Sequence, residues 1–512
     1  MRRSNGGIIG PDNVTTGGAF GSASGVFKLG EVTDLIRQNK WPTAGPSSTV
    51  ANSCRFNDGS TDSLSRSNGT PSSRRIFTFS GWYKRGVSNA GGNNQQLFSI
   101  YTDTSNRMDF RFQSGDTIDF YNTGSLGRLT TNRKFTDFSS WYHVVIRVDT
   151  TQSTAADRFR LYINGVQETS FSTATYPSED ADLGTNFSTM EIGDDSYSNS
   201  QYDGYMAEVI YCDGQSLAPT SFGETNSDSG IWVPKTITGL TFGNIGYYLK
   251  FTNASALGED FSGENNDFTV NNLTSVDQST DTPNNNFCVQ NSAATAISGS
   301  PSFSEGNLTI GSGSGWKTTI GTFALTSGKW YWENRGSGSG AGTLIYGIAS
   351  TAVIDAGGAS SGLNNDATIG VNLPAYGYHG SSGSMYYSNT SGNGQGRSTW
   401  GTAYNPGDLI SVYLDLDNNK LYMAKNDALQ VSGVGYDIQA GYSYYPMTVP
   451  NSNTLNMNYG IGSFGTTAVS SAVADTNGFG AFEYSPNRGG AAVFDGEAKN
   501  FLALCTNNLN SI

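Results

Sequence analysis

Two stretches of alternating side chains constrain this chain more than any other feature of its sequence. In the first, apolar residues recur at every second position on both sides of a Ser/Thr/Ala-rich turn: Tyr142, Val144, Ile146 and Val148 before it, Phe159, Leu161 and Ile163 after it. Period-two alternation of β-branched and aromatic residues predicts strands. Asn164-Gly165 then supplies the positive φ angles of a tight turn. The stretch therefore predicts an antiparallel hairpin with one buried face.

The second stretch, Asp408 to Asp427, repeats this pattern. Its apolar face is formed by Ile410, Val412, Leu414 and Leu416, and after a turn at Asp417-Asn418-Asn419 by Leu421 and Met423. The chain is therefore predicted to hold at least two antiparallel β domains.

Charge restricts the partners. Only 14% of the 512 residues are charged, against a typical ~25%, and the net charge is −14. An acidic chain without a Lys/Arg run repels phosphate backbones and anionic lipid surfaces, so we expect no nucleic acid and no membrane insertion. The length suggests about three domains.

The four cysteines, Cys54, Cys212, Cys288 and Cys505, form no CxxC pair, which argues against zinc and a disulfide scaffold and predicts free buried thiols. The N-terminal residues lack an apolar signal-peptide core, and no window reaches the ~18 apolar residues of a membrane span. We expect a protein folded in a cytoplasm and released by lysis.

Four segments are predicted. Residues 1–50 form an arm with one short helix, whose apolar residues Val32, Leu35 and Ile36 share a face and which ends after Trp41, before Pro42. Such a helix cannot hold itself together, so it must pack on the chain's own later domains or on another protein. We favour the second alternative and expect an attachment arm. Residues 51–222 and 290–512 are predicted β-sandwiches, and residues 223–289 an extended connector draped over them and held by Trp232, Tyr248 and Phe251. The fold class is all-β, with two antiparallel, jelly-roll-type sandwiches.

Several segments resemble known families. The order "FTFSGWYKRG", "WYHVVIRVD", "RLYINGVQ", "AEVIYCDGQSL" resembles laminin-G-like domains of the concanavalin A-like lectin/glucanase fold. The later "GKWYWE", "YGIAS", "YGYHG", "PGDLISVYLDLDNNKLYMAKND", "YYPMTV" occur in the order of SPRY domains, another β-sandwich of related topology.

The whole chain is also similar to bacteriophage virion proteins, through "GGIIGP", "SGVFKLGE" and "NKWP", "LKFTNASALGEDFSGENNDFTVNNL" and "NFLALCTNNL". This resemblance implies localisation to a virion and a structural or adhesive role.

No catalytic constellation is expected. Neither of the two histidines, His143 and His379, has a Ser or Cys nucleophile motif nearby, and His143 is predicted to be structural. Glu191 and Asp194 are three residues apart, which points them to opposite faces of a regular strand and argues against a hydrolase acid pair. Asp415, Asp417 and Asn419 fail the calcium-loop pattern. We expect no cofactor and no metal, with calcium near Asp194 and Asp195 left open.

Two clusters combine aromatic rings with amides or carboxylates, the groups that sugar binding needs. The first comprises Asp195, Tyr197, Asn199 and Tyr202; the second comprises Tyr378, His379, Tyr386, Tyr387 and Asn389. The alternative is that these tyrosines only pack their own loops.

The favoured function is a non-enzymatic phage tail fibre or other adhesin that recognises a host-surface glycan or protein receptor. The alternatives are a capsid or tail decoration or joining protein without a host ligand, and a glycan depolymerase. The arm would bind other virion proteins.

We also expect a homo-oligomer, often a trimer in such appendages, with contacts through the arm and through the connector around Trp232 and Tyr247–Phe251. The alternative is a monomer whose connector packs only on its own two sandwiches.

Overall fold

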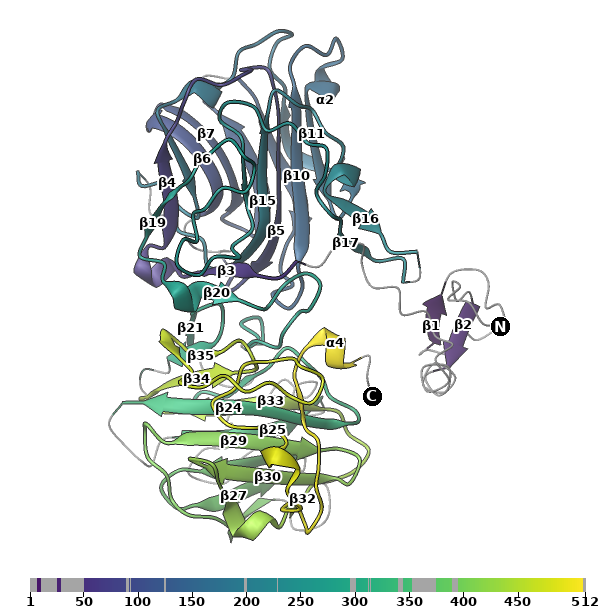
Figure 1. Cartoon of the computed structure of the whole chain (residues 1–512), viewed down its shortest axis with the longest axis vertical. Helices are drawn as coiled ribbons and strands as arrows, with labels where there is room; N and C mark the ends of the chain where they lie inside the picture. Colours follow the sequence, from purple (N-terminus) through teal and green to yellow (C-terminus); the bar gives the residue numbers. More distant parts are fainter. Residues whose placement is uncertain are drawn as a thin grey trace.

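The structure, a computed structural model, describes residues 50–88, 92, 94–123, 126–197, 200–227, 229–294, 301–311, 313, 315–338, 344–351, 374–388 and 395–509. It also describes the backbone of two short paired strands, β1 (Gly7–Gly10) and β2 (Gly25–Lys28). The predicted helix of the arm, with Val32, Leu35, Ile36 and Trp41, lies outside the described residues. Two sandwiches follow one another along the long axis of the molecule (Figure 1).

The first sandwich consists of two eight-stranded sheets. The β5 sheet has the order β12 (Val166–Gln167), β11 (Phe159–Ile163), β10 (Tyr142–Asp149), β5 (Ile76–Arg85), β15 (Gly204–Asp213), β3 (Ser53–Phe56), β20 (Gln278–Ser279), with β18 (Tyr247–Leu249) also paired to β15. The β7 sheet has the order β13 (Phe171–Thr175), β9 (Arg128–Lys134), β8 (Thr117–Asn122), β7 (Asn106–Gln113), β6 (Gln95–Asp103), β14 (Thr189–Ile192), β4 (Ser63–Ser67), β19 (Thr269–Asn271).

The second sandwich has a nine-stranded and a six-stranded sheet. The β24 sheet has the order β21 (Ser302–Ser304), β22 (Thr309–Gly311), β34 (Thr454–Asn458), β24 (Lys329–Ser337), β29 (Leu409–Asp415), β30 (Lys420–Lys425), β31 (Ala428–Leu429), with β32 (Tyr436–Asp437) paired to β30 and β37 (Leu502–Ala503) to β24. The β25 sheet has the order β23 (Thr319–Ile320), β33 (Tyr444–Pro450), β25 (Leu344–Ser350), β26 (Ala375–His379), β27 (Ser384–Ser388), β28 (Gln395–Thr399).

The remaining short elements are the strand pairs β16 (Gly223–Thr225) with β17 (Trp232–Pro234) and β35 (Ser463–Phe464) with β36 (Thr467–Ala468), the helices α2 (Ala155–Arg158) and α4 (Thr506–Leu509), and 3-10 turns. The predicted all-β fold class is therefore confirmed. Among the described residues, no helix is long and apolar enough to span a membrane.

Both predicted hairpins are confirmed. Strands β10 and β11 pair Ile146 with Leu161, and the turn after β11 has positive φ angles at Asn164 (48°) and Gly165 (78°). Strands β29 and β30 pair Leu414 with Leu421. The apolar faces predicted for both hairpins lie in the cores.

The expectation of only one buried face is wrong for both hairpins. His143 and Val145, on the other face of β10, are fully buried because the segment that follows β15 covers this sheet with Phe222, Phe242 and Tyr248. In the second sandwich, Tyr413 of β29 packs against Phe494 and Phe501 of the C-terminal segment. Each sandwich is therefore covered by chain that follows it in the sequence.

One buried carboxylate fixes the C-terminal cover. Glu333 of β24 accepts hydrogen bonds from the backbone N–H groups of Glu483 and Tyr484, from Asn458 Nδ2 and from Tyr331 Oη, at 2.8–3.1 Å. Burial raises the pKa of Glu333 to about 7, although these donors oppose the shift.

Residues 223–289 are more than a draped connector. They add β18 and β20 to the β5 sheet and β19 to the β7 sheet, and Tyr247, Leu249 and Phe251 lie in the core of the first sandwich. Trp232 is half-buried against the same domain. The aromatic residues expected to form oligomer contacts are therefore used within the chain itself.

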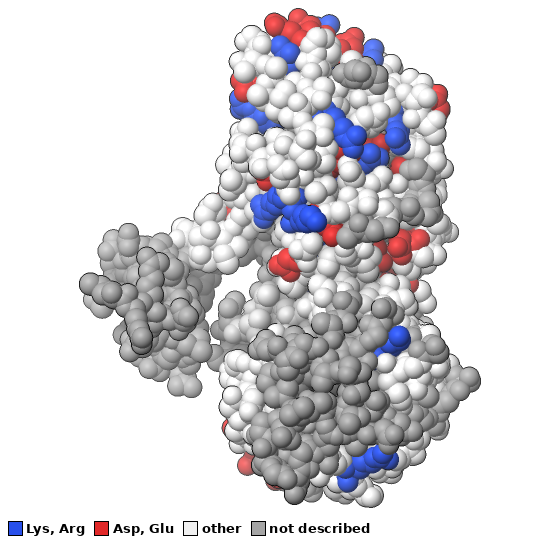
Figure 2. All heavy atoms as spheres, turned by 180° about the vertical axis from the view of Figure 1, so that it is seen from behind, with Lys and Arg blue, Asp and Glu red and all other residues white. Residues whose placement is uncertain are grey.

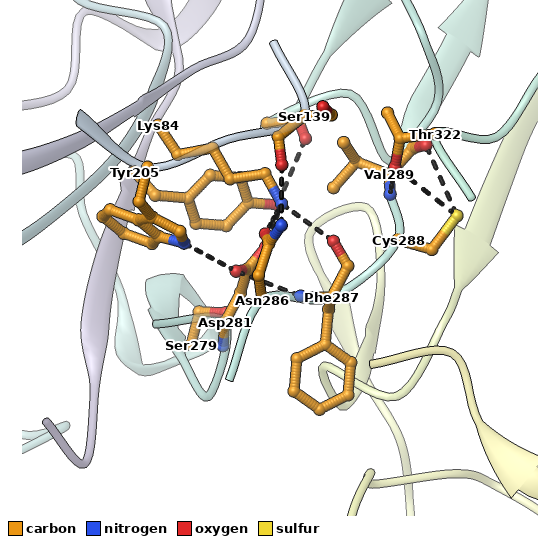
Figure 3. Close-up of polar contacts among 12 residues, drawn as sticks. Lys84, Ser139, Tyr205, Ser279, Asp281, Asn286, Phe287, Cys288, Val289 and Thr322 are labelled. Atoms are coloured by element: carbon orange, nitrogen blue, oxygen red, sulfur yellow. Dashed lines mark hydrogen bonds and ion pairs between the residues drawn. The ribbon is translucent and has the colours of Figure 1, made fainter. Parts of the chain in front are cut away.

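A buried ion pair joins the two sandwiches. Lys84 of β5 donates from Nζ to Asp281 Oδ2 (2.7 Å), Asn286 Oδ1 (2.7 Å) and Phe287 O (2.8 Å), so its three protons are all used (Figure 3). Trp141 Nε1 donates to the other oxygen of Asp281 at 3.1 Å. Both charged side chains are inaccessible to solvent. The chain that enters the second sandwich is thus tied to a central strand of the first.

A second ion pair and a shared core extend this junction. Arg55 of β3 lies 3.0 Å from both Asp277 and Glu305, and it also donates to Ser463 Oγ of the second sandwich at 3.3 Å. The largest hydrophobic cluster is continuous across the junction, from Trp82, Trp141 and Tyr205 to residues of both sheets of the second sandwich. The two sandwiches consequently form one packed body.

All four cysteines are buried free thiols, as predicted. Burial raises their pKa values, to about 12 for Cys212 and Cys505, so the reactive thiolate form is disfavoured.

Removing the ammonium at the junction should destabilise the protein strongly. Lys84→Met leaves the Asp281 carboxylate buried without its counter-charge, and breaking a buried pair in this way costs about 3–5 kcal/mol. Urea unfolding followed by tryptophan fluorescence measures the loss. As a control, Arg75→Met removes exposed ion pairs to Asp180 and Asp182 and should leave the unfolding midpoint nearly unchanged. Equal midpoints for the two variants would contradict a stabilising role of the Lys84 network.

Candidate ligand-binding face

The outer face of the β7 sheet carries an ordered set of polar and aromatic side chains. Strand β7 alternates strictly: Met108, Phe110 and Phe112 are fully buried in the core of the sandwich, so Arg107, Asp109 and Arg111 project to the other side. Cross-strand pairing then sets a row over five strands, which comprises Glu191 (β14), Ser99 (β6), Asp109 (β7), Tyr121 (β8) and Arg128 (β9).

Three guanidinium groups surround the ring of Tyr121. The central carbons of Arg107, Arg111 and Arg128 lie 5.4, 6.0 and 5.5 Å from its centroid, within cation–π range. Arg107 and Arg128 remain partly open to solvent, with side chains that are 22% and 36% exposed, whereas Arg111 is buried. The face therefore presents aromatic and hydrogen-bonding groups together.

Two carboxylates hold these arginines in place. Asp109 pairs with Arg107 (3.4 Å) and Arg111 (3.2 Å), and Asp119 pairs with Arg111 (3.1 Å) and Arg128 (2.7 Å). Both carboxylates are fully buried beneath the guanidinium groups. Other basic and acidic side chains lie close together on the surface of the first sandwich when it is viewed from behind (Figure 2). The charges nearly cancel, so the face suits a polar ligand more than a strongly ionic one.

The first predicted sugar cluster only partly belongs to this face. Tyr197 reaches it: its hydroxyl donates to Asp109 Oδ1 at 2.5 Å and its ring meets Tyr101 edge-on at 4.9 Å. Asp195 is buried within the same loop. Tyr202 is a core residue that packs near Phe56 and Tyr83, so its ring offers no face to a ligand. Asn199 lies outside the described residues.

The second predicted cluster is divided between two faces of the β25 sheet. Tyr378 is fully buried in the sandwich core, where it packs on Tyr404 and donates to Thr402 O. Half-buried Tyr387 packs against the same core. His379 and Tyr386 stack on each other at 4.6 Å on the opposite face, both nearly inaccessible.

These four side chains of the second cluster therefore cannot contact one ligand together, because alternation along β26 and β27 separates them. Asn389 lies outside the described residues.

The acidic pair considered for hydrolysis serves its own loop. Asp194, past the end of β14, accepts from the Asp195 N–H at 2.8 Å and from Gln201 Nε2 at 3.2 Å. Glu191 accepts from Ser196 Oγ at 2.5 Å, and burial raises its pKa.

Asp415, considered for a calcium loop, is fully buried and bonded to Lys499, within a hairpin turn. The described residues contain no group of three or more His, Cys, Asp or Glu side chains that could hold a metal ion.

His143 has a structural setting. It is sandwiched between Trp82 (4.6 Å) and Trp232 (5.9 Å). Trp232 Nε1 donates to its Nδ1 at 3.0 Å, which leaves the proton on Nε2, 2.9 Å from Ser80 Oγ. Burial lowers the pKa of His143 to about 3, because an imidazolium would lose solvation and the Trp232 hydrogen bond.

The polar row went unrecognised at the sequence level, although its signal was present. "RMDFRFQ" alternates Arg107, Asp109 and Arg111 with apolar residues, and an outward strand face with three charges in a chain of low charge content is unusual. What the sequence did not reveal is that Asp119 and Arg128, from two further strands, lie beside it.

A family model matches part of the chain. Residues 58–214 match the model described as "Concanavalin A-like lectin/glucanases superfamily", a range that runs from just before β4 to the end of β15. The first sandwich thus has a concanavalin A-like fold, and its polar row lies within the matched range. No curated protein matches the chain.

Solved structures give weaker likenesses. The chain is similar to a human SPRY domain, with 16% identity over 29% of this chain and 90% of that one and a TM-score of 0.22. It is similar to a pentraxin from Limulus polyphemus, with 14% identity over 33% of this chain and 80% of that one and a TM-score of 0.26. It is also similar to a candidate carbohydrate binding protein from Bacteroides ovatus, with 14% identity over 44% of this chain and 59% of that one and a TM-score of 0.31. These TM-scores are too low to carry an argument about function.

The setting of His143 generates a pH dependence. Its pKa is about 3 in the folded chain and about 6.5 when unfolded, so its contribution to stability is complete above pH 6.5 and is lost as the pH falls towards 3. Between pH 7 and pH 5 the loss should be about 2 kcal/mol. Urea unfolding at both values, compared for the wild type and His143→Gln, isolates this contribution because the carboxylates are common to both proteins. Identical pH dependences for the two proteins would show that His143 titrates normally in the fold.

Proposed function

We propose that the first sandwich is a saccharide-binding module and that the outer face of the β7 sheet is its binding face. The observation that carries the proposal is the placement of the Tyr121 ring beside the partly exposed Arg107 and Arg128, with the buried Arg111 also within cation–π range. The match of the surrounding residues to a family of lectins and glucanases supports it.

The chemistry of the face suits a sugar. A pyranose has apolar C–H faces, which pack on an aromatic ring, and hydroxyl groups, which both donate and accept hydrogen bonds. Tyr121 and Tyr101 supply rings, and the guanidinium groups supply donors held in fixed positions by Asp109 and Asp119. Groups that are ordered before the ligand arrives lose little entropy on binding, which favours affinity.

We propose binding rather than hydrolysis. A glycosidase needs one carboxyl group free to give a proton and a second one to act on the sugar or on water. On this face Asp109 and Asp119 are each paired with two arginines, and Glu191 is bonded to Ser196. Glu191 is thus the one of these three carboxyl groups with no arginine partner among the described residues, and one carboxyl group does not make the pair that glycoside hydrolysis needs.

The proposed setting is a phage virion, in which the chain would serve as a tail fibre or other appendage that recognises a host-surface glycan. The support is the resemblance of its N-terminal, middle and C-terminal segments to virion proteins. We further propose that residues 1–50 bind other virion proteins and that the chain forms a homo-oligomer, with a trimer favoured. A decoration or joining protein without a host ligand is the alternative role.

Loss of the Arg128 guanidinium group or of the Tyr121 ring should weaken the binding of an oligosaccharide. Arg128→Ala and Tyr121→Ala are each expected to lower the affinity for a bound oligosaccharide at least about ten-fold, the equivalent of about 1.4 kcal/mol. A panel of neutral β-glucan, galactan and uronate oligosaccharides, followed by calorimetric titration of those that bind, measures the effect.

A matched control separates this face from the opposite one. Arg160 has a similarly exposed side chain, 28%, on β11 of the β5 sheet, and Arg160→Ala should bind like the wild type. Equal losses for Arg128→Ala and Arg160→Ala would contradict the assignment of the face. If the protein binds neither a member of the panel nor whole host cells, the decoration role is favoured instead.

A further inference from the structure

A short segment of the chain itself occupies the polar row on the β7 sheet. Residues 194–197, between β14 and β15, place two hydroxyl groups on the row: Ser196 Oγ donates to Glu191 Oε1 and Tyr197 Oη donates to Asp109 Oδ1, both at 2.5 Å. The two acceptors are buried, whereas Ser196 is exposed and Tyr197 is half-buried. The segment therefore stands between the carboxylates and the solvent.

The ring of Tyr197 occupies a slot between an aromatic and a cationic side chain. Tyr101 meets the ring edge-on at 4.9 Å, and the guanidinium carbon of Arg107 lies 5.1 Å from its centroid. A flat six-membered ring that carries a hydroxyl group is thus bound by an aromatic residue, an arginine and a carboxylate. A pyranose could pack its C–H groups on Tyr101, donate a hydroxyl to Asp109 and accept a hydrogen bond from Arg107 in place of the cation–π contact.

The segment is also held in an unfavourable backbone conformation. Ser196 has a φ of 37°, in the left-handed region that residues other than glycine adopt at some cost. Its hydrogen bonds to the carboxylate side chains must compensate for this cost. A ligand that offers its own hydroxyl groups to Glu191 and Asp109 would remove that compensation and release the strain.

From these contacts we infer that residues 194–197 form an autoinhibitory strap, in which the Ser196 and Tyr197 hydroxyl groups stand in for two hydroxyl groups of a saccharide. The inference rests on the proposed sugar-binding face and adds its regulation: a sugar must displace the strap in order to reach Asp109 and Glu191. It also narrows the ligand class to a neutral ring with two hydroxyl groups free to donate, since the groups that the strap occupies are acceptors.

Loss of a hydroxyl group from residues 194–197 should change the saccharide affinity in opposite directions if these residues form a displaceable strap and if they form a permanent part of the binding site. Tyr197→Phe keeps the ring but removes the donor to Asp109, so a strap would be displaced more easily and the affinity for the neutral oligosaccharides of the panel should rise, by about five- to ten-fold. A fixed wall that contributes to binding would lose affinity or show no change. Ser196→Ala should act in the same direction as Tyr197→Phe.

The matched control is Tyr422→Phe in the second sandwich, which removes a comparable tyrosine–carboxylate hydrogen bond, 2.7 Å to Asp495. It should leave affinity unchanged. Thermal unfolding of each variant identifies any that fails to fold, and Ser196→Ala, at an exposed position, keeps the test available if Tyr197→Phe is unstable.

Hydrogen exchange of the wild-type protein gives an independent readout. Saturation with a bound oligosaccharide should increase exchange at the backbone amides of residues 194–197, because the strap is released, and decrease it in β7 and β8. Unchanged or lower affinity of Tyr197→Phe, with protection of residues 194–197, would overturn the strap while the binding face stands. If Arg128→Ala and Tyr121→Ala bind as tightly as the wild type, the binding face itself is wrong and the strap falls with it.

Discussion

The arrangement of the whole molecule depends on the hydrogen bonds and the ion pair that the buried ammonium group of Lys84 makes. A lysine can remain charged in a protein interior only where acceptors replace the water it has lost, and here one carboxylate, one side-chain amide and one backbone carbonyl do so. All three belong to residues 281–287, the chain that leaves the first sandwich and enters the second (Figure 3). The ion pair thus fixes the path of the chain at the point where the two hydrophobic cores meet, and Arg55 repeats this arrangement on β3, which lies beyond β15 in the same sheet.

Covering segments explain why the candidate binding face lies on the β7 sheet. The chain after β15 covers the outer face of the β5 sheet, and the C-terminal segment covers that of the β24 sheet with Phe494 and Phe501. On the β7 sheet, Arg107, Tyr121 and Arg128 stay partly exposed, and Arg107 contacts the short strap at one end of the row. The buried carboxylates of Asp109 and Asp119 orient the arginine side chains of this face.

The local parts of this fold could be predicted from the sequence, and the parts set by distant contacts could not. Alternation at 142–148 and 410–416 predicted the strands of both hairpins and their core faces, because the side-chain period of a strand is a property of the strand alone. The same alternation could not show that Val145 and Tyr413 are covered, since the covering residues follow much later in the chain. For the site, tyrosine-rich loops were a poor guide: Tyr202 and Tyr378 point into cores, whereas the row around Tyr121 is created by pairing between strands.

The use of residues 247–279 to complete the first sandwich has a consequence for synthesis. Strands β3 and β4, near the start of the domain, pair with β20 and β19, more than 200 residues later. When the ribosome has released residue 222, both edges still lack their last strand, and at roughly 5–20 residues per second the chain needs several more seconds to supply it. During that time the nascent domain has open strand edges, which are templates for mispairing between neighbouring chains. A slow translation step between residues 222 and 279 would lengthen this interval.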